Sequence, residues 1–430
     1  MNSIDLIIKN GKIINHDEEI VADIAVKDGK IVEIGKSLSG ATNSIDATGL
    51  VILPGLIDSQ VHFREPGLTH KEDIKSGSKG AALGGICTYF EMPNTNPPTT
   101  TVTAVQEKLD IASKTSYTNY YFYIGATDSN LEELKKAQEL PGCIGVKIFL
   151  GSSTGDLLLY NEEKLLEIFK NITVPIAVHC ESEKRLNERK HIRDEATSVH
   201  AHYDWRDPQS ALEATQMIIA IAKKAGRKVH VLHVSTKEEI EFLKANKAHC
   251  TFELTPQHLT LSAPEIYDNI DTLAQMNPPI RTKDHTEALW SAVDEDVVDV
   301  FGSDHAPHTL NEKRKGYPHS PSGMPGVQTI FPVMLFHMNK GRITLQKIVE
   351  KLSYNPAKIF GLNKGRVEVG RDADFTIVDL DKEWVINTKD QASKCGWTPF
   401  YGMLVKGAPV ITIVSGTIAM IKGEVFNKGK

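Results

Sequence analysis

The stretch LPGLIDSQVHFRE, residues 53–65, decides the fold of this chain. It opens with a nearly continuous apolar run, LPGLID, and then turns polar at Gln60, His62 and Arg64. A strand that is apolar on both faces is typical of a parallel sheet whose two faces are both covered. Seven more runs of this kind follow, at 86–92, 120–126, 145–150, 175–180, 229–235, 250–255 and 298–304.

Amphipathic helical patterns separate several of these strands. The clearest lie at Gln209–Lys224, Lys237–Asn246 and Asn130–Leu140. Eight strand–helix units over roughly 310 residues predict an α/β fold, a (β/α)8 barrel of the TIM type. We expect the barrel to occupy residues 53–365.

The two ends of the chain share a different texture. Short Val- and Ile-rich runs in the first fifty residues are separated by NG and DG pairs, which favour tight hairpins. The segment after residue 365 repeats this pattern, with glycine turns between its strands. Neither end alone offers enough strands for a stable core. Residues 1–52 plus 366–430 are therefore predicted to form one composite small β-sandwich domain.

Composition narrows the class of protein. Hydrophobic residues make up 40% and charged residues 24%, and the net charge is 49 − 55 = −6, which argues against a nucleic-acid binder. No apolar run is long enough to span a membrane, and no secretory signal is recognisable. The five cysteines are odd in number and lack a CxxC pair, which predicts reduced thiols in a cytoplasmic protein.

Polar side chains collect where the predicted strands end, which in a barrel of this type is where active sites lie. His62, Lys147, His179, His233 and Asp304 all follow or end such runs. Taken singly, each histidine is more simply a hydrogen-bonded structural residue, Lys147 half of an ion pair and Asp304 a helix cap. Taken together they face one mouth, and two or three histidines with a carboxylate suit Zn²⁺ or a similar divalent ion. A lysine amine that has reacted with CO2 could bridge two such ions, which requires a desolvated, neutral amine.

These residues lie within motifs that resemble the dihydroorotase family of the amidohydrolase superfamily. The motifs are PGLIDSQVHFREPGLTHKEDI, MPNTNPPT, GVKIFL, AVHCE, VLHVST, LTPQHL, MNPPIR, GSDHAPH, GWTPFYG and IVSG, which together cover nearly the whole chain. The resemblance implies a metal-dependent hydrolase barrel. It also implies the reversible hydrolysis of (S)-dihydroorotate to N-carbamoyl-L-aspartate in de novo pyrimidine (UMP) biosynthesis.

The resemblance also assigns roles by position. His62 and Asp304 would bind a first metal, His179 and His233 a second, and carboxylated Lys147 would bridge them. Arg64 and Asn94 would hold the substrate carboxylate, with Asn277 and His308 lining the substrate pocket. A metal-bound hydroxide would attack the ring amide, and Asp304 would act as general base and then general acid.

One position departs from the family pattern. The usual signature is Asp-x-His-x-His, whereas this chain has Asp58, Gln60 and His62. A glutamine carbonyl is a weaker zinc ligand than imidazole. Gln60 could ligate weakly, turn away, or leave the first site empty, so one or two zinc ions are expected, and a weakened first metal is the arrangement we favour.

Two rival functions remain open at this stage. A hydantoinase- or allantoinase-like cyclic amidohydrolase shares the fold and metals, but such relatives typically lack an arginine at the position of Arg64. A non-catalytic dihydroorotase-like subunit that supports aspartate transcarbamoylase is the other, and Gln60 is its only support. The family suggests a homodimer with a small-molecule substrate. The Gly- and Pro-rich segment 308–326 is expected to border or cover that substrate.

Overall fold

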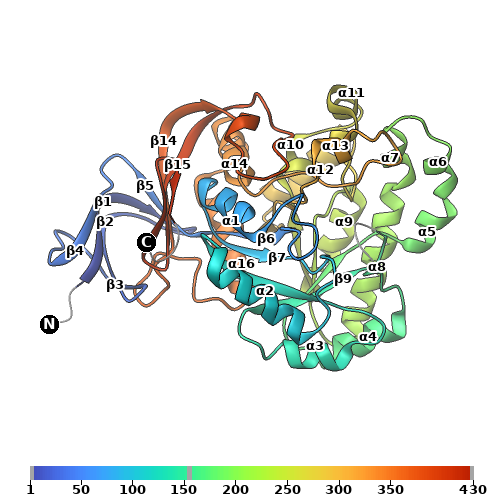
Figure 1. Cartoon of the computed structure of the whole chain (residues 1–430), viewed down its shortest axis with the longest axis horizontal. Helices are drawn as coiled ribbons and strands as arrows, with labels where there is room; N and C mark the ends of the chain where they lie inside the picture. The colour runs from blue at the N-terminus through green and yellow to red at the C-terminus, as the bar shows by residue number, and fades with distance from the viewer. Residues whose placement is uncertain (1–3, 153–156, 427–430) are drawn as a thin grey trace.

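The computed structural model describes residues 4–152 and 157–426. An eight-stranded parallel sheet forms the centre of the molecule, in the order β13-β12-β11-β10-β9-β8-β7-β6. A parallel bridge between Val61 and His305 brings its two edges together into a barrel (Figure 1). The strands are β6 (Leu56–Val61), β7 (Ile86–Glu91), β8 (Asn119–Gly125), β9 (Cys143–Phe149), β10 (Ile176–His179), β11 (Val229–Val231), β12 (Cys250–Leu254) and β13 (Val300–Phe301). The predicted (β/α)8 barrel is confirmed.

Helices surround this barrel and bury its outer face (Figure 1). They include α1 (Ile74–Leu83), α2 (Val102–Thr115), α3 (Leu131–Ala137), α4 (Glu162–Asn171), α5 (Glu183–Glu188), α6 (Lys190–Asp194), α7 (Ala201–Trp205) and α8 (Pro208–Ala225). The second half adds α9 (Lys237–Ala245), α10 (Pro256–Thr260), α11 (Glu265–Ile270), α12 (Lys283–Asp294), α13 (Leu310–Lys313), α14 (Ile330–Asn339), α15 (Leu345–Val349) and α16 (Asn355–Ile359). None of the described helices is long and apolar enough to cross a membrane.

Helix α8 shows why its sequence folds as it does. Asp207 caps the first turn by accepting from the amide of Ser210, and Pro208 occupies the first helical position, where its missing N–H costs nothing. Gly226 ends the helix with a φ of +67°, a left-handed conformation that glycine adopts without strain. The prediction of a helix at 209–224 agrees with these bounds within one residue at each end.

The strands from the two chain ends form a second, mixed sheet beside the barrel (Figure 1). Its order is β17-β16-β15-β14-β5-β1-β2-β3, with β4 paired to β1. The strands are β1 (Ile4–Ile14), β2 (Glu19–Lys27), β3 (Lys30–Gly35), β4 (Ala41–Asp46), β5 (Val51–Pro54), β14 (Phe375–Val385), β15 (Leu404–Val414), β16 (Thr417–Ile421) and β17 (Glu424–Val425). The end-formed β-domain is therefore confirmed.

The junction between the two ends is the antiparallel pairing of β5 with β14. It makes the β-domain one continuous hydrogen-bonded path, whereas a sandwich in the strict sense has two separate sheets. Apolar side chains of both ends, such as Ile8, Ile24, Phe375 and Ile413, pack in one shared core. The predicted boundaries, 1–52 plus 366–430 against 53–365, remain a prediction.

Candidate active site

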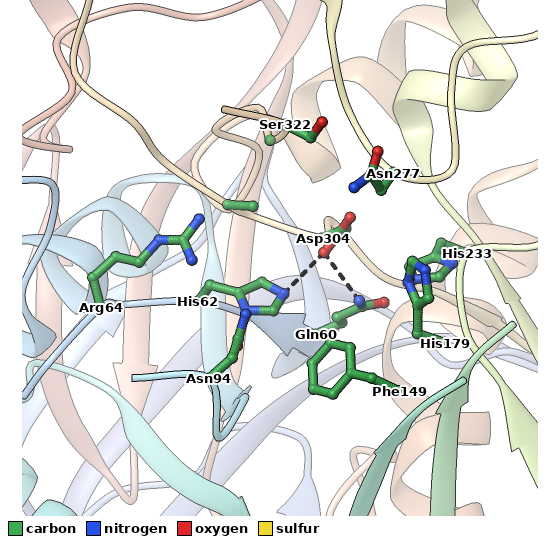
Figure 2. A pocket seen from close by; sticks show the side chains of 12 residues that line it. Gln60, His62, Arg64, Asn94, Phe149, His179, His233, Asn277, Asp304 and Ser322 are labelled. Carbon is green, nitrogen blue, oxygen red and sulfur yellow. Dashed lines mark hydrogen bonds and ion pairs between the residues drawn. The ribbon is translucent and has the colours of Figure 1, made fainter. Parts of the chain in front are cut away.

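A pocket opens at the carboxyl ends of the barrel strands, as the sequence predicts (Figure 2). Eight of the predicted site residues line it: Gln60, His62, Arg64, Asn94, His179, His233, Asn277 and Asp304. The other two, Lys147 and His308, are buried and absent from the lining. The lining also includes Ser322 and Gly323, from the segment 308–326, and Phe149 and Ala306, which sequence reasoning did not single out.

On one side of the pocket, Asp304 faces both Gln60 and His62 (Figure 2). Gln60 Nε2 donates to Asp304 Oδ1 over 3.0 Å, and because an ionised carboxylate only accepts, the amide nitrogen must be the end that faces it. Gln60 Oε1 is buried without a hydrogen-bond partner. The carbonyl of Gln60, the only part that could bind a cation, therefore points away from Asp304.

The protonation of His62 is set by Asn94. Asn94 Oδ1 lies 2.6 Å from His62 Nδ1 and can only accept, so the ring carries a proton on Nδ1. Burial lowers the pKa of His62, which favours the neutral ring. His62 Nε2 then presents a lone pair to Asp304 Oδ1, 3.1 Å away. Two acceptors facing each other are an arrangement that a bound cation would relieve.

On the opposite side, His179 and His233 form a second pair. His179 Nδ1 lies 3.0 Å from His233 Nε2, and His179 Nε2 donates to Glu181 Oε2 over 2.9 Å. Burial alone would raise the pKa of Glu181, but Arg206 and His179 hold it at about 2, so Glu181 is ionised. A carboxylate behind a histidine fixes the tautomer and leaves the front nitrogen free to bind a metal. Glu181 and Arg206 were not predicted, although Glu181 stands within the AVHCE motif.

Lys147 lies on β9 beneath the pocket. Its side chain is buried, its Nζ has no hydrogen-bond partner, and it sits 4.4 Å from the centre of the Phe149 ring. Burial lowers the pKa of Lys147 to about 7, against the opposing effect of Asp304. A substantial fraction of neutral amine is thus present near neutral pH, which is the form that reacts with CO2.

These residues fit a divalent metal centre. Within residues 4–152 and 157–426, no three side chains drawn from His, Cys, Asp and Glu converge as a ready-made site. Each half instead supplies two candidate ligands, His62 with Asp304 and His179 with His233. An unpartnered buried amine lies close enough to Asp304 to feel its charge, so a carboxylated Lys147 could complete both halves.

Arg64 supplies positive charge at the edge of the pocket. It is buried, donates through Nε to Pro307 O over 3.2 Å, and its Nη1 has no hydrogen-bond partner. Lys71 Nζ can only donate to His308 Nδ1, 3.1 Å away, so His308 carries its proton on Nε2 and donates it to Ser322 O. Arg64 Nη2, 3.2 Å from that same Nε2, therefore finds no acceptor there. The two terminal nitrogens match a planar anion such as a carboxylate.

Asn277 faces Arg64 across the pocket (Figure 2). His202 Nε2 donates to Asn277 Oδ1 over 3.0 Å and also to Met276 O over 2.9 Å. Because the oxygen of the amide is engaged from behind, its NH2 group is the end directed into the pocket. His202 lies in α7 and belongs to no recognised motif, so the sequence did not indicate a role for it at the site.

The backbone is strained at three of these positions. Arg64, His233 and Asp304 have φ values of +63°, +38° and +43°, in the left-handed region that side chains with a Cβ rarely adopt. Such residues cost about 1–3 kcal/mol each and persist where the surrounding structure holds them, most often at functional sites. Here each one directs its side chain into the pocket.

The amidohydrolase family profile matches residues 51–419, which span the barrel and part of the end sheet. The chain belongs to the amidohydrolase family. This amidohydrolase is 37% identical over 421 residues to a dihydroorotase of Pyrococcus abyssi, covering 97% of this chain and 96% of that one. It is 34% identical over 442 residues to an L-hydantoinase of Paenarthrobacter aurescens, covering 98% and 96% of the two chains.

Among solved structures, this amidohydrolase is similar to the L-hydantoinase (dihydropyrimidinase) of Arthrobacter aurescens. The TM-score is 0.94 and the identity 33%, over 98% of this chain and 97% of that one. The relatives share the barrel with a sheet from the chain ends. Our assignment to a metal-dependent cyclic amidohydrolase is thereby confirmed, and a divalent metal follows from the family.

The segment 308–326 borders the pocket of this amidohydrolase, as we expected. Ser322 and Gly323 line it, and α13 lies at the start of the segment. Gly323 has a φ of +145°, and a Cβ there would lie 2.4 Å from Ala306 O, so only glycine lets the segment approach so closely. The glycine alone could suggest that the backbone approaches a neighbour closely at this position. The sequence could not show that the position lies at the pocket.

Proposed function

We propose that this amidohydrolase is a dihydroorotase, which hydrolyses (S)-dihydroorotate reversibly to N-carbamoyl-L-aspartate. The observation that carries the proposal is Arg64, a buried guanidinium whose Nη1 lacks a partner at the edge of the pocket. Dihydroorotate carries a carboxylate on its ring, whereas hydantoin and dihydrouracil do not. Leaving the terminal nitrogens of a buried arginine without an acceptor is costly, so the pocket favours the anionic ring.

The chain's own residues bind and orient that ring. Arg64 offers two terminal nitrogens to the carboxylate, and Asn277 lines the opposite wall of the pocket. Holding the ring at both ends places its amide carbonyl against Asp304 and the two histidine pairs. His308, which we expected on the pocket lining, contributes from behind by keeping the segment of Ser322 next to Arg64.

Asp304 is placed to move the proton. Its carboxylate is held by Gln60 Nε2 and lies beside His62, with only 5% of the residue exposed. We propose that Asp304 takes a proton from the attacking water and returns it to the leaving ring nitrogen. A divalent metal, when bound, would lower the pKa of that water and polarise the carbonyl. His62, His179, His233, Asp304 and carboxylated Lys147 would hold it.

We propose zinc as the metal, because imidazole and carboxylate ligands suit it. We favour two ions, which carboxylated Lys147 would help to hold together with the two histidine pairs, and the half that contains His62 and Asp304 would hold its ion more weakly. The support is Gln60, whose Nε2 faces Asp304 while its Oε1 points toward the side of His179 (Figure 2). An amide oriented in this way adds no ligand to the His62 half.

Replacing Gln60 by His is expected to strengthen metal binding in the half of the centre that contains His62 and Asp304. Imidazole is the better zinc ligand, so the Q60H variant should retain closer to two ions per chain after dialysis, where the parent retains nearer one. Inductively coupled plasma mass spectrometry of both proteins checks this, with Q60L as the control that removes the amide without adding a ligand. Equal metal content in Q60H and Q60L would contradict the proposed role of Gln60.

The first test of the proposed function compares substrates. Purified protein, with and without added zinc, is assayed for ring opening of dihydroorotate, dihydrouracil and a 5-substituted hydantoin. Dihydroorotate should have the highest kcat/KM. The similarity to L-hydantoinases favours hydantoin hydrolysis as the second candidate. A higher kcat/KM for hydantoin would replace the proposal by that function.

The R64Q variant separates these candidates at a single residue. Losing the paired guanidinium should raise KM for dihydroorotate by about 100-fold, because a charge-assisted pair contributes about 1.5–3 kcal/mol or more when desolvated. Its kcat at saturation should change far less. Any residual turnover of dihydrouracil serves as the internal control, since that ring has no carboxylate. Equal losses for both rings would show that Arg64 acts on the fold rather than on the carboxylate.

We further propose that the chain works in the cytoplasm as a homodimeric enzyme, and that it is not an inactive partner of aspartate transcarbamoylase. The support is that Lys147, His179, His233, Asp304 and Arg64 are all present together. Protein that binds no metal and turns over no cyclic amide, yet alters aspartate transcarbamoylase on mixing, would reverse this proposal. Sedimentation velocity would decide the oligomeric state.

A further inference from the structure

Lys313 is a fully buried cation at the end of α13. Its exposed fraction is 0%, and no carboxylate contacts it among the residues that the structure describes. Its ammonium group instead donates to three carbonyl oxygens, Gln275 O at 2.8 Å, Pro321 O at 2.9 Å and Gly323 O at 3.1 Å. An ammonium group has three donors, so all three are used.

These carbonyls belong to two different loops. Gln275 precedes Asn277 by two residues, and Asn277 lies on the wall of the pocket. Pro321 and Gly323 flank Ser322, and both Ser322 and Gly323 line the pocket. Lys313 therefore joins the loop that carries Asn277 to the segment that borders the pocket on the side of Arg64.

Further bonds join the same two loops. Gln275 O, held by Lys313, also accepts from Gly323 N over 2.9 Å. The side chain of Gln275 donates to Ser320 O over 3.0 Å and to the Ser322 hydroxyl over 3.1 Å. Ser322 O in turn accepts from His308, which lies against Arg64. A chain of hydrogen bonds thus links the loop of Asn277 to Arg64, and Lys313 holds some of the atoms in that chain.

We propose that Lys313 is a positioning residue that sets the separation of the Asn277 loop and the 320–324 segment, and thereby the width of the substrate pocket. The proposal rests on the proposed function for its kinetic consequence. A neutral side chain cannot satisfy three carbonyls in this way, so they would be left buried and unpaired. The two loops would then be joined only by the bonds that Gln275 makes to Ser320, Ser322 and Gly323, and their separation would be set less tightly. The candidate metal ligands, which stand on other segments, would stay in place.

The K313M variant tests this proposal. KM for dihydroorotate should rise by about tenfold, kcat should change by less than about threefold, and metal content should match the parent. Hydrogen exchange at the Gly323 amide should become faster. The matched control is K351M, which removes another buried lysine, 1% exposed and paired with Asp296 and Glu350, none of which lines the pocket. It should lose stability without changing KM.

Two outcomes would overturn the proposal: an unchanged KM in K313M, or the same rise in KM in K351M. If K313M does not fold, K313R keeps the charge but replaces the three-donor geometry by a planar one, and it should raise KM in the same direction. A parent enzyme without dihydroorotate turnover would refute the proposed function alone, because the exchange at Gly323 can still be compared between parent and variant.

Discussion

The D304N variant is expected to lose about 1,000-fold or more in kcat while its fold is retained, since general acid–base catalysis is typically worth 10²–10⁴-fold. Asn has the size of Asp but cannot accept the proton. Its amide oxygen can still accept from Gln60 Nε2, so the contact that holds residue 304 is retained. Single-turnover ring opening of dihydroorotate, with circular dichroism on the same sample, measures both properties.

A matched control lies at the other end of the same strand. Asp299 precedes β13 and pairs with Lys247, whereas Asp304 follows β13 at the pocket. The D299N variant should lose stability but keep its turnover. Near-parental kcat in D304N would refute the acid–base assignment, and loss of kcat in both variants would show that the strand, not the carboxylate, is responsible.

The K147M variant is expected to lose bound metal and activity together. Met fills nearly the same volume beneath the pocket but can form no carbamate, so neither half of the centre would be completed. Metal content should fall below half of the parental value, and kcat should fall by about 1,000-fold or more. Metal analysis after extensive dialysis and a saturating assay with added zinc measure the two losses separately.

Bicarbonate provides the complementary test on the unmodified chain. Apoprotein prepared in CO2-free buffer should regain activity with zinc faster when bicarbonate is present, because Lys147 has a pKa of about 7 and offers a neutral amine. K147M should show no such response. Full metal binding and activity in K147M would exclude a structural or chemical role of the lysine at the centre.

The barrel could be predicted because its signal is local. Each strand is a short apolar run, and the bounds of β7, β8, β9 and β12 agree with the prediction within two residues. Two strands are shorter than their apolar runs suggest. β11 ends at Val231 and β13 at Phe301, because the chain leaves the sheet early to reach His233 and Asp304 in left-handed conformations. Side-chain patterns carry no information on that turn of the backbone.

The sequence predicted most of the candidate site residues whose side chains line the pocket. The positioning residues were not predicted. His202 and Lys313 act through contacts with residues far away in the sequence, whereas Glu181 contacts His179, two residues before it. A buried lysine among polar loop residues looks like a solvated one in the sequence, since only the three-dimensional fold brings the carbonyls of Gln275 and Gly323 to it. The same reason explains why His308 was placed on the lining rather than behind Arg64.

The pairing of β5 with β14 has a consequence for how the chain is made. A ribosome that adds about 5–20 residues per second needs roughly 16 to 65 s to travel from Pro54 to Phe375, the first pair of that ladder. During this time the edge of β5 has no neighbour on that side, and the whole barrel emerges in between. Nascent chains stalled before residue 375 should therefore bind chaperones and be cut by protease at the amino-terminal strands. Chains stalled after β15 should resist both.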